Sequence, residues 1–461
     1  MENPLLGAWR GLVEESPGSV ALVESLEGRV HSRSAIASGA SRVSEIYREE
    51  VPHPLRRRVA LAIPNGSTWL HVFIGLIEAG AVPVPIDPSE PEDARRSASA
   101  AAGASFYWRD GHFVPIPGSW ARRSLPNECL VKVSSGSTGE AKGLPATFAQ
   151  MVADGGQICR TMGIGPGDAN LATIPFGYSY GLGNLVIPLL TQGTKVICAS
   201  SALPHALASD IAAHKPTVIP TVPPVLKALA QSDIPPGSTA SVRLVISAGS
   251  PLDPVVARAF LEKFGIRVHG FYGTSETGGI AFDRTGDATI GGQSVGKPLD
   301  GVRVRVSSRG KLTVWSPAVL GSGRFSPADL VSLNAAGELV LAGRSDRVVK
   351  VAGHRVDLAQ IERALRSLDG VADAFVHANG GAEATIGAAV QCTLKPAEIR
   401  RHLRAKLASW KLPVRIVVLG QFPVTARGKT NFHALRQALS APRTATSIST
   451  LSAERQMSAR R

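Results

Sequence analysis

Short apolar runs that alternate with helical patterns dominate the first two-thirds of the chain. Residues 57–64 (RRVALAIP) have the composition of a buried strand, residues 69–80 (WLHVFIGLIEAG) that of a helix, and residues 81–87 (AVPVPID) that of a second strand. Similar apolar runs with turn residues beside them follow at residues 194–199, 217–222 and 243–249. Because strands that alternate with helices form largely parallel sheets covered by helices, we predict an α/β fold with parallel sheets for this region.

The pattern changes near residue 303 and again near residue 343. Residues 302–317 and 337–343 have the glycine-containing turns of antiparallel hairpins, which predicts a small β-barrel-like part. A compact α+β unit follows, with strands predicted at residues 348–351, 371–378, 384–394 and 414–423 and helices at residues 359–368 and 396–407. We therefore predict an N-terminal domain over residues 1–343, a C-terminal α+β domain over residues 344–440 and a disordered tail over residues 441–461.

Composition argues against several classes of protein. The 461 residues carry a net charge of +14, but no Lys/Arg block is interleaved with aromatic residues, so we expect no nucleic-acid binding. The excess charge fits either an acidic partner or a generally basic proteome. The four cysteines are dispersed without a CxxC pair, which argues against a zinc site and favours a reducing cytoplasm. The first residues lack a secretory pattern, and Glu78, Pro83 and Pro85 interrupt the apolar stretch 70–86, so we expect no membrane span.

One stretch, residues 134–143 (SSGSTGEAKG), combines glycines, hydroxyl groups and a lysine after a predicted strand end. Glycines let a backbone approach an anion closely, and successive N–H groups can then form a concave anion site. The stretch is not a Walker phosphate loop, because Ala141 stands where that motif has its second glycine and Gly143 where it has Ser or Thr. From these residues alone, a phosphate loop and a flexible turn are both open.

The stretch resembles the signature loop of the adenylate-forming superfamily, which includes acyl-CoA synthetases, peptide-synthetase adenylation domains and luciferases. The family usually has proline where this chain has Ala141. Further segments resemble those of the family in the same order, at residues 77–88, 174–190, 245–252, 271–279, 343–362 and 423–429. The resemblance covers nearly the whole chain, and it implies a large adenylation domain followed by a small mobile domain.

The resemblance also implies a site for ATP and Mg²⁺. Tyr272 would stack on adenine, Ser275 would bond the α-phosphate, and Glu276 would hold the metal through a carboxylate oxygen. Asp329 would accept hydrogen bonds from the ribose hydroxyls, and Lys429 would stabilise the charge between the carboxylate and the α-phosphate. Ser275, Glu276 and Lys429 are the implied catalytic residues. The implied ATP-binding residues are Ser134, Ser135, Gly136, Ser137, Thr138, Gly139, Lys142, Ala248, Gly249, Ser250, Tyr272, Gly273, Thr274, Ser275, Asp329, Arg344 and Lys429.

Two further regions carry implied roles. Asp346 would be the hinge of the mobile domain, and Gly353 and Arg355 would face the tunnel for a thiol. The run YGLGN at residues 180–184 is similar to benzoate and hydroxybenzoate ligases, and no Asp that would grip an amino group is evident. We therefore favour an aryl or short-to-medium acyl acid. The implied acyl pocket consists of Tyr178, Ser179, Tyr180, Gly181, Gly249, Gly273 and Gly278.

The implied activity is that of an ATP-dependent acid–thiol ligase. It would activate a small carboxylic acid as an acyl-adenylate, release pyrophosphate, and pass the acyl group to coenzyme A or to the phosphopantetheine of a carrier protein. Acyl carrier proteins are typically acidic, so a basic protein would attract one. The predicted helix 396–407 is a candidate docking face, with a plain solvated face as the alternative; its basic residues are Arg400, Arg401, Arg404 and Lys406.

Two alternatives stay open at this level. The chain could transfer the acyl group to an acceptor other than a thiol, or it could be a family member without turnover. The second alternative draws support only from Ala141 and two more departures. Gly270 stands where the family often has Asn, Asp or Gln, so backbone atoms must replace a side-chain contact to adenine, and Pro327-Ala328 replaces Thr-Gly before Asp329.

Overall fold

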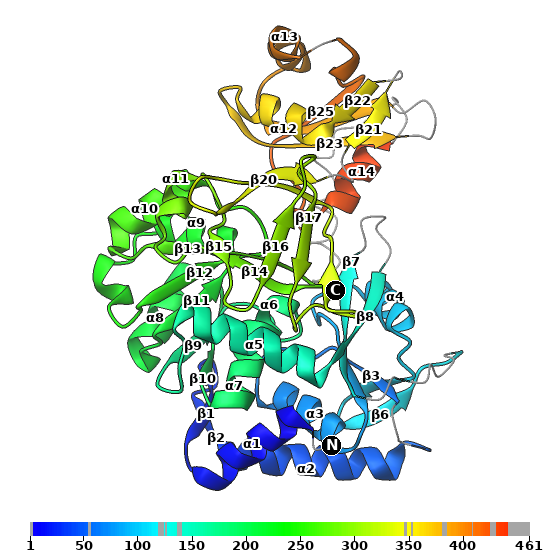
Figure 1. Cartoon of the computed structure of the whole chain (residues 1–461), viewed down its shortest axis with the longest axis vertical. Helices are drawn as coiled ribbons and strands as arrows, with labels where there is room; N and C mark the ends of the chain where they lie inside the picture. Colours follow the sequence, from blue (N-terminus) through cyan, green and yellow to red (C-terminus); the bar gives the residue numbers. More distant parts are fainter. Residues whose placement is uncertain are drawn as a thin grey trace, which may run out of the picture. The chain divides into compact units, whose positions relative to one another are not determined.

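The computed structural model describes residues 3–53, 57–118, 124, 127–135, 141–344, 348–351, 354–379, 385–407, 409–424 and 430–440. The chain divides into two compact units, Met1–Ser345 and Asp346–Arg461 (Figure 1). Each unit has its own hydrophobic core, as expected for domains. The tail predicted at residues 441–461 lies outside the described residues.

A nine-stranded sheet forms the centre of the first unit, in the order β15-β14-β13-β12-β11-β9-β10-β1-β2. The strands from β13 to β1 pair in parallel, whereas β2, β14 and β15 pair antiparallel at the two edges. This arrangement confirms the predicted α/β fold. The strands are β1 (Val20–Glu24), β2 (Arg29–Ser32), β9 (Ala169–Ala172), β10 (Lys195–Cys198), β11 (Val218–Thr221), β12 (Leu244–Ser247), β13 (Val268–Thr274), β14 (Gly278–Phe282) and β15 (Lys297–Pro298).

Helices cover both faces of this sheet, which explains why β9, β11 and β12 are buried along their whole length. Leu171, Ile219 and Val245 share one core with α8 (Pro204–His214), α9 (Pro223–Gln231) and α10 (Pro254–Phe264). Val218 and Leu244 point to the opposite face and share a core with α5 (Phe148–Met162). Figure 1 shows α5 and α7 (Ile187–Gln192) crossing the sheet on one side. Two short helices, η2 (Pro236–Thr239) and α11 (Asp287–Gly291), complete this region.

A second sheet, in the order β4-β3-β5-β6, lies in the N-terminal part of the same unit. Val59 and Leu61 belong to the core formed with α1, α2 and α3, whereas Ala60 and Val84 pack with α4. The strand, helix and strand predicted at residues 57–87 are β3, α3 and β4. The elements are α1 (Pro4–Glu15), α2 (Arg33–Glu50), β3 (Arg58–Leu61), α3 (Ser67–Glu78), β4 (Val82–Pro85), α4 (Glu92–Ala102), β5 (Phe106–Arg109) and β6 (His112–Pro115).

Small antiparallel sheets complete the first unit. β7 (Glu128–Ser135) and β8 (Ala141–Thr147) form a hairpin. The hairpins predicted near residues 302–343 form two sheets joined by a bridge between Lys311 and Leu330. Their strands are β16 (Arg303–Val306), β17 (Leu312–Trp315), β18 (Arg324–Phe325), β19 (Asp329–Leu333) and β20 (Leu339–Arg344).

The second unit is an α+β structure built on the sheet β23-β24-β25. Ile361 of α12 and Ile399 and Leu403 of α13 pack on one face, and Leu435 and Leu439 of α14 pack on the other. The elements are β21 (Val348–Val351), β22 (His354–Asp357), α12 (Leu358–Arg366), β23 (Val371–Asn379), β24 (Thr385–Cys392), α13 (Pro396–Lys406), η4 (Ser409–Lys411), β25 (Arg415–Leu419) and α14 (Phe432–Ser440).

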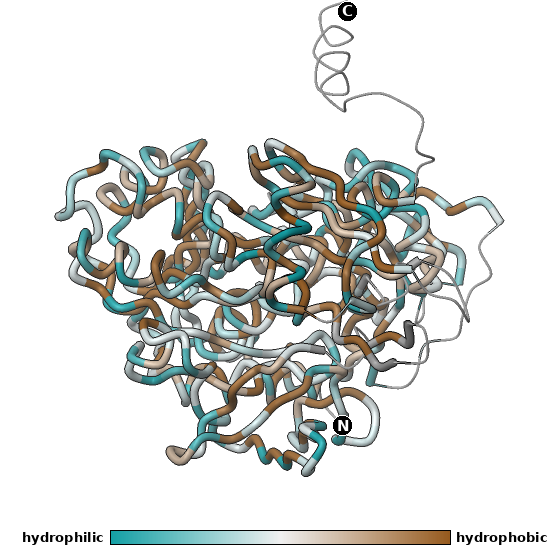
Figure 2. The backbone as a smooth tube through the Cα atoms, turned by 90° about the horizontal axis from the view of Figure 1, so that it is seen from above, coloured by the Kyte–Doolittle hydropathy of each residue, from teal (hydrophilic) through white to brown (hydrophobic). Residues whose placement is uncertain are grey.

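Two general features agree with the composition. All four cysteines are buried and free. No helix within the described residues is both long enough and apolar enough to cross a membrane. In Figure 2 the hydrophobic stretches are short and alternate with hydrophilic ones along the tube.

Candidate functional site

The turn between β13 and β14 carries Ser275 and Glu276. Thr274 and Gly278 face each other at the ends of the two antiparallel strands. The hydroxyl groups of Thr274 and Thr277 lie 3.1 Å apart across the turn, and the Leu320 N–H donates to the Glu276 carbonyl oxygen at 2.8 Å. These contacts fix the backbone of the turn at both ends, and this backbone carries the side chains of Ser275 and Glu276.

Tyr272 of β13 and Asp329, which lie far apart in the sequence, contact each other. The Tyr272 hydroxyl donates to Asp329 Oδ2 at 2.8 Å. Asp329 is the first residue of β19 and pairs with Arg344, the last residue of β20. The structure therefore brings the two side chains implied for adenine and ribose together and aligns the Arg344 backbone beside them. Only the backbone of Arg344 belongs to the described structure.

Ala248, Gly249 and Ser250 follow directly after β12, at the carboxyl end of the parallel strands. β12 is the parallel neighbour of β13, with Ser247 opposite Gly270. Ligands of open α/β sheets bind outside this end of the strands. Gly249 and Ser250 are exposed there, while Ala248 is buried. The segment is thus placed for nucleotide contact beside the strand that carries Tyr272.

The backbone of Gly270 is hydrogen-bonded within the protein. Its N–H donates to Thr289 Oγ1 at 2.8 Å, and its carbonyl oxygen accepts from the Asp283 N–H at 2.9 Å. Because the amide hydrogen is already used inside the protein, a donor contact to adenine has to come from another residue.

The SSGSTGEAKG stretch spans the tip of the β7–β8 hairpin. Ser134 stands opposite Lys142, and Ser135 stands opposite Ala141, so both ends of the stretch are strand residues. Lys142 is exposed. Ala141 therefore occupies the first position of a strand. The tip itself lies outside the described residues and comprises Gly136, Ser137, Thr138, Gly139 and Glu140.

The remaining predicted residues of the second unit are only partly described. Arg355 pairs with Lys350 in the β21–β22 hairpin, and only its backbone is described. Asp346, Gly353 and Lys429 lie outside the described residues.

The predicted acyl segment begins at a short helix, α6 (Ser179–Gly181), that continues into a π-helical turn, η1 (Leu182–Val186). The Tyr180 hydroxyl donates to the Ile246 carbonyl oxygen at 3.0 Å, which ties the segment to β12. The Ser179 hydroxyl oxygen is buried and has no hydrogen-bond partner among the described residues. A buried hydroxyl of this kind usually finds a partner, so a bound ligand or water is expected to supply it.

Two glycines of the predicted acyl pocket are explained by close packing. A Cβ atom on Gly181 would overlap the Pro175 carbonyl oxygen. Gly278 has a φ of +67°, and a Cβ atom there would overlap the Asp154 carboxylate. Both positions require glycine for reasons that are internal to the protein.

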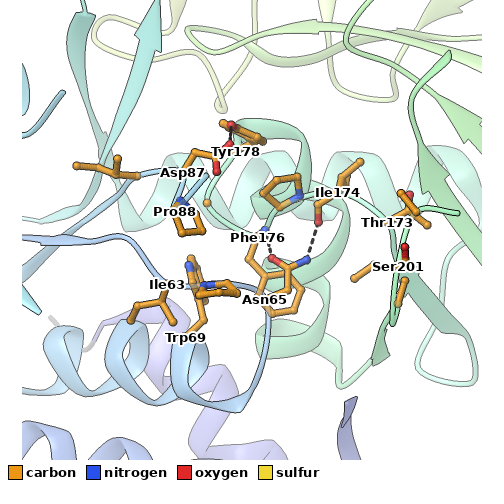
Figure 3. Close-up of a pocket in the computed structure, with 17 residues that line it drawn as sticks. Ile63, Asn65, Trp69, Asp87, Pro88, Thr173, Ile174, Phe176, Tyr178 and Ser201 are labelled. Atoms are coloured by element: carbon orange, nitrogen blue, oxygen red, sulfur yellow. Dashed lines mark hydrogen bonds between the residues drawn. The ribbon is translucent and has the colours of Figure 1, made fainter. Parts of the chain in front are cut away.

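A cavity of about 230 Å³ lies beyond Tyr178, between the carboxyl ends of β3, β4, β9 and β10. Its walls include Trp69, Ile86 and Phe176 (Figure 3). Figure 3 shows Asn65 held between Ile174 and Phe176, because its amide donates to the Ile174 carbonyl oxygen and accepts from the Phe176 N–H. Among the residues predicted for the acyl pocket, all of which the structure describes, only Tyr178 lines this cavity.

Three candidate functional residues were not recognised from the sequence: Asp87, Lys132 and Asp154. The Tyr178 hydroxyl donates to Asp87, whose other oxygen accepts from the Ser89 N–H at 2.7 Å. Lys132 and Asp154 are both buried next to the Ser275–Glu276 turn. The sequence offers one weak signal for them: Lys132 is a lone charge inside the apolar run of a strand.

The carboxylate of Glu276 suits Mg²⁺, which prefers hard oxygen ligands. No group of three or more His, Cys, Asp or Glu residues that could hold a metal occurs in the part of the chain that the structure describes. In nucleotide sites Mg²⁺ is usually bound by one or two carboxylates together with substrate phosphates and water, and Glu276 is a candidate for such a ligand.

Comparison with known proteins identifies the family of the chain. The family model of AMP-binding enzymes matches residues 122–322, and that of the AMP-binding enzyme C-terminal domain matches residues 360–429. The chain is 28% identical over 350 residues to the benzoate–CoA ligase of Thauera aromatica. The aligned region covers 68% of this chain and 66% of that ligase. It is 26% identical over 459 residues to the p-hydroxybenzoic acid–AMP ligase of Mycobacterium tuberculosis, covering 87% of this chain and 64% of the relative. The chain thus spans slightly less than two-thirds of each of these two curated relatives.

Solved structures share the fold. ATP-bound MatB from Rhodopseudomonas palustris superimposes with a TM-score of 0.79 at 20% identity, over 95% of this chain and 99% of that one. The O-succinylbenzoate coenzyme A synthetase of Bacillus subtilis, in complex with AMP, gives a TM-score of 0.78 at 20% identity with the same coverage. At this identity the likeness concerns the fold alone. The matches to both family models, over residues 122–322 and 360–429, show that the chain belongs to the AMP-binding enzymes, the adenylate-forming superfamily.

Proposed function

We propose that the protein is an ATP-dependent, AMP-forming ligase that joins a carboxylic acid to a thiol. In the first step a carboxylate oxygen of the acid attacks the α-phosphorus of ATP, and the bond to the β-phosphate oxygen breaks. Pyrophosphate leaves with that electron pair, and an acyl-adenylate forms. In the second step the sulfur of coenzyme A, or of phosphopantetheine on a carrier protein, attacks the acyl carbon. AMP leaves, and the thiol proton passes to solvent.

The observation that carries the proposal is the contact between Asp329 and Tyr272, on the strand that leads into the Ser275–Glu276 turn. Tyr272 presents an aromatic ring for adenine, while its hydroxyl is hydrogen-bonded to Asp329 at 2.8 Å. Asp329 can then accept from the ribose hydroxyls through its carboxylate. This separation of roles suits a nucleoside whose base stacks and whose sugar is held by hydrogen bonds. The family membership supports the same interpretation.

The remaining roles follow the family pattern. Ser275 bonds the α-phosphate, and Glu276 holds Mg²⁺, which supplies positive charge between the phosphates when it is bound. The hairpin tip 136–140 and Lys142 hold the triphosphate through N–H groups, hydroxyls and one cation. Lys429 stabilises the charge that develops as the carboxylate attacks. Asp346 is the hinge, and Gly353 and Arg355 face the thiol.

We propose an aryl or short-to-medium acyl acid as the substrate. The segment of Tyr178, Ser179, Tyr180 and Gly181 lies beside β12, and the buried Ser179 hydroxyl offers a hydrogen bond to a ligand. The names of the two aryl-acid relatives support this class. The packing around Gly181 and Gly278 implies that these two glycines shape the pocket through the backbone rather than by leaving open space.

The acceptor is a thiol of coenzyme A or of a carrier protein. For a carrier protein we propose docking on α13, where Arg401, Arg404 and Lys406 are exposed beside the buried Ile399 and Leu403. The exposed charges complement an acidic partner. Acyl transfer to a carrier protein should then weaken as ionic strength rises, whereas a flat response would count against this face.

A pyrophosphate-release screen tests the proposal. The full chain is incubated with ATP, Mg²⁺ and a panel of aryl and alkyl acids, with coenzyme A, with a carrier protein, or with neither. We expect release that depends on one class of acid and AMP release that depends on a thiol. Thiol-independent turnover would favour an acceptor other than a thiol, and no turnover with any acid would favour a family member without catalysis.

The variant Lys429→Ala sharpens the screen. We expect it to lose acyl-adenylate formation while its melting temperature stays at the wild-type value, because Lys429 acts on developing charge. The measurement is ATP–pyrophosphate exchange with the acid found in the screen. Exchange near the wild-type rate would refute the role given to Lys429.

A further inference from the structure

Lys132 and Asp154 are two buried residues of opposite charge, and each contacts the backbone at or next to the Ser275–Glu276 turn. Lys132 lies on β7 and is 3% exposed, and Asp154 lies on α5 and is 2% exposed. The Lys132 ammonium donates to the Ser275 carbonyl oxygen at 3.5 Å. Asp154 Oδ1 accepts from the Gly279 N–H at 2.9 Å. The pair therefore contacts the backbone of the turn on both sides of Glu276.

Burial and the neighbouring charge act in opposite senses on the pKa of each residue. Burial lowers the pKa of Lys132, and the nearby carboxylates of Asp154 and Glu276 oppose that shift. Burial raises the pKa of Asp154, and Lys132 and the Gly279 N–H oppose that shift. Lys132 thus contacts Ser275, which is next to Glu276, and Asp154 contacts Gly279.

Fold stability alone does not account for such a pair. Removing two charges from water is costly, and a buried ion pair is often no more stabilising than apolar residues of the same volume. Inside a protein, however, the electric field of a charge is much stronger than in water. The electric field of a buried lysine next to such a turn therefore acts most strongly on the turn itself and on the phosphates and cation that bind there.

We propose that Lys132 is a positioning residue for the ATP-binding turn, with Asp154 as its counter-charge. Lys132 holds the Ser275 carbonyl and adds positive potential where the phosphates bind, and Asp154 fixes the far end of the turn through Gly279. The inference rests on the proposed function and adds to it a lysine distinct from Lys142 and Lys429. Its role is to hold Ser275 and Glu276 in register and to strengthen the binding of anionic nucleotide.

The test compares Lys132→Met with the double variant Lys132→Met/Asp154→Asn. Methionine has a similar volume without the charge, and asparagine keeps an oxygen acceptor for the Gly279 N–H. In Lys132→Met the lone Asp154 can take up a proton, so this variant remains usable if the double variant does not fold. ATP affinity in the presence of Mg²⁺ is measured by calorimetry, the KM for ATP and kcat by pyrophosphate exchange, and stability by thermal melting.

We expect both variants to bind ATP about tenfold more weakly, with a matching rise in the KM for ATP and a smaller change in kcat. The double variant should melt at or above the temperature of Lys132→Met, because no buried charge is left unpaired. Asp168→Asn is the matched control. It removes a partner of Arg243 at the amino ends of β9 and β12, so it should lower stability and leave ATP affinity unchanged.

The outcomes separate this inference from the proposed function. If the wild-type protein binds ATP and both variants bind it within about twofold of wild type, the pair is merely structural and the inference is refuted. If Asp168→Asn weakens ATP binding as much as Lys132→Met does, general destabilisation explains the effect and the inference fails. A wild-type protein that binds no ATP would overturn the proposed function and this inference with it.

Discussion

The hydroxyl group of Tyr272 provides a direct test of the nucleotide site. The variant Tyr272→Phe removes one oxygen atom and leaves the ring, so stacking on adenine is retained. The lost contact is the 2.8 Å hydrogen bond to Asp329 Oδ2, in a partly buried position. We expect the Asp329 carboxylate to be less well oriented for the ribose hydroxyls as a result.

The magnitude follows from the nature of the bond. A hydrogen bond to a charged group contributes about 1.5–3 kcal/mol, and partial exposure to water places this one near the lower end. A loss of about 1–1.5 kcal/mol corresponds to a rise of about five- to thirteen-fold in the KM for ATP. The effect on kcat should be smaller, because the contact orients the nucleotide in the ground state and the transition state alike.

Pyrophosphate exchange at varied ATP concentration measures this effect. Tyr107→Phe, on β5 of the other sheet, removes the same atom away from the site and should leave the KM for ATP unchanged. Asp329→Asn should raise the KM at least as much as Tyr272→Phe. The reasoning is refuted if Tyr272→Phe has the wild-type KM while Asp329→Asn does not, because the hydroxyl would then play no part in orienting the carboxylate.

Three further variants test the framework around the site. Glu128→Gln breaks a buried ion pair in which Arg58 Nε lies 2.8 Å from Glu128 Oε1. Urea unfolding should show that the free energy of unfolding falls by about 3–5 kcal/mol, and a fall below about 1 kcal/mol would contradict this. Gly278→Ala places a Cβ atom against Asp154 at a φ of +67°. The free energy of unfolding should fall by about 2–4 kcal/mol and pyrophosphate exchange should slow, whereas an unchanged unfolding midpoint would show that the turn can adapt. Burial raises the pKa of Asp168, but Arg243, the Gly165 N–H and Thr217 outweigh it and hold the pKa below its usual value. The stability that this carboxylate contributes is present above the unfolded pKa of about 3.9 and is lost as pH falls through the folded pKa. Asp168→Asn should therefore be less stable than wild type at pH 7, and this difference in stability should shrink below about pH 4. A difference that stays constant with pH would refute the linkage.

Local patterns in the sequence carry much of the fold. The apolar runs that became β10, β11 and β12 could be recognised because strands buried on both faces are apolar throughout. The helices at residues 359–368 and 396–407 could be recognised because their apolar residues share one face. The helices and strands at the start of the chain were harder to predict. α1, α2 and the β1–β2 hairpin went unrecognised, since β2 is an exposed edge strand without a clear apolar pattern. Motif resemblance supplied the candidate residues, and the roles given to them remain predictions.

The sequence by itself determined the fold class and the kinds of side chain available for nucleotide chemistry, because propensity, burial and motif spacing act over a few neighbouring residues. Tertiary structure alone decided which of these residues meet. Packing between separate sheets and a helix places Tyr272 against Asp329 and puts Lys132 and Asp154 next to the Ser275–Glu276 turn. The structure also revealed that Gly181 and Gly278 are required by packing. Such contacts join distant parts of the chain, and no local pattern records them.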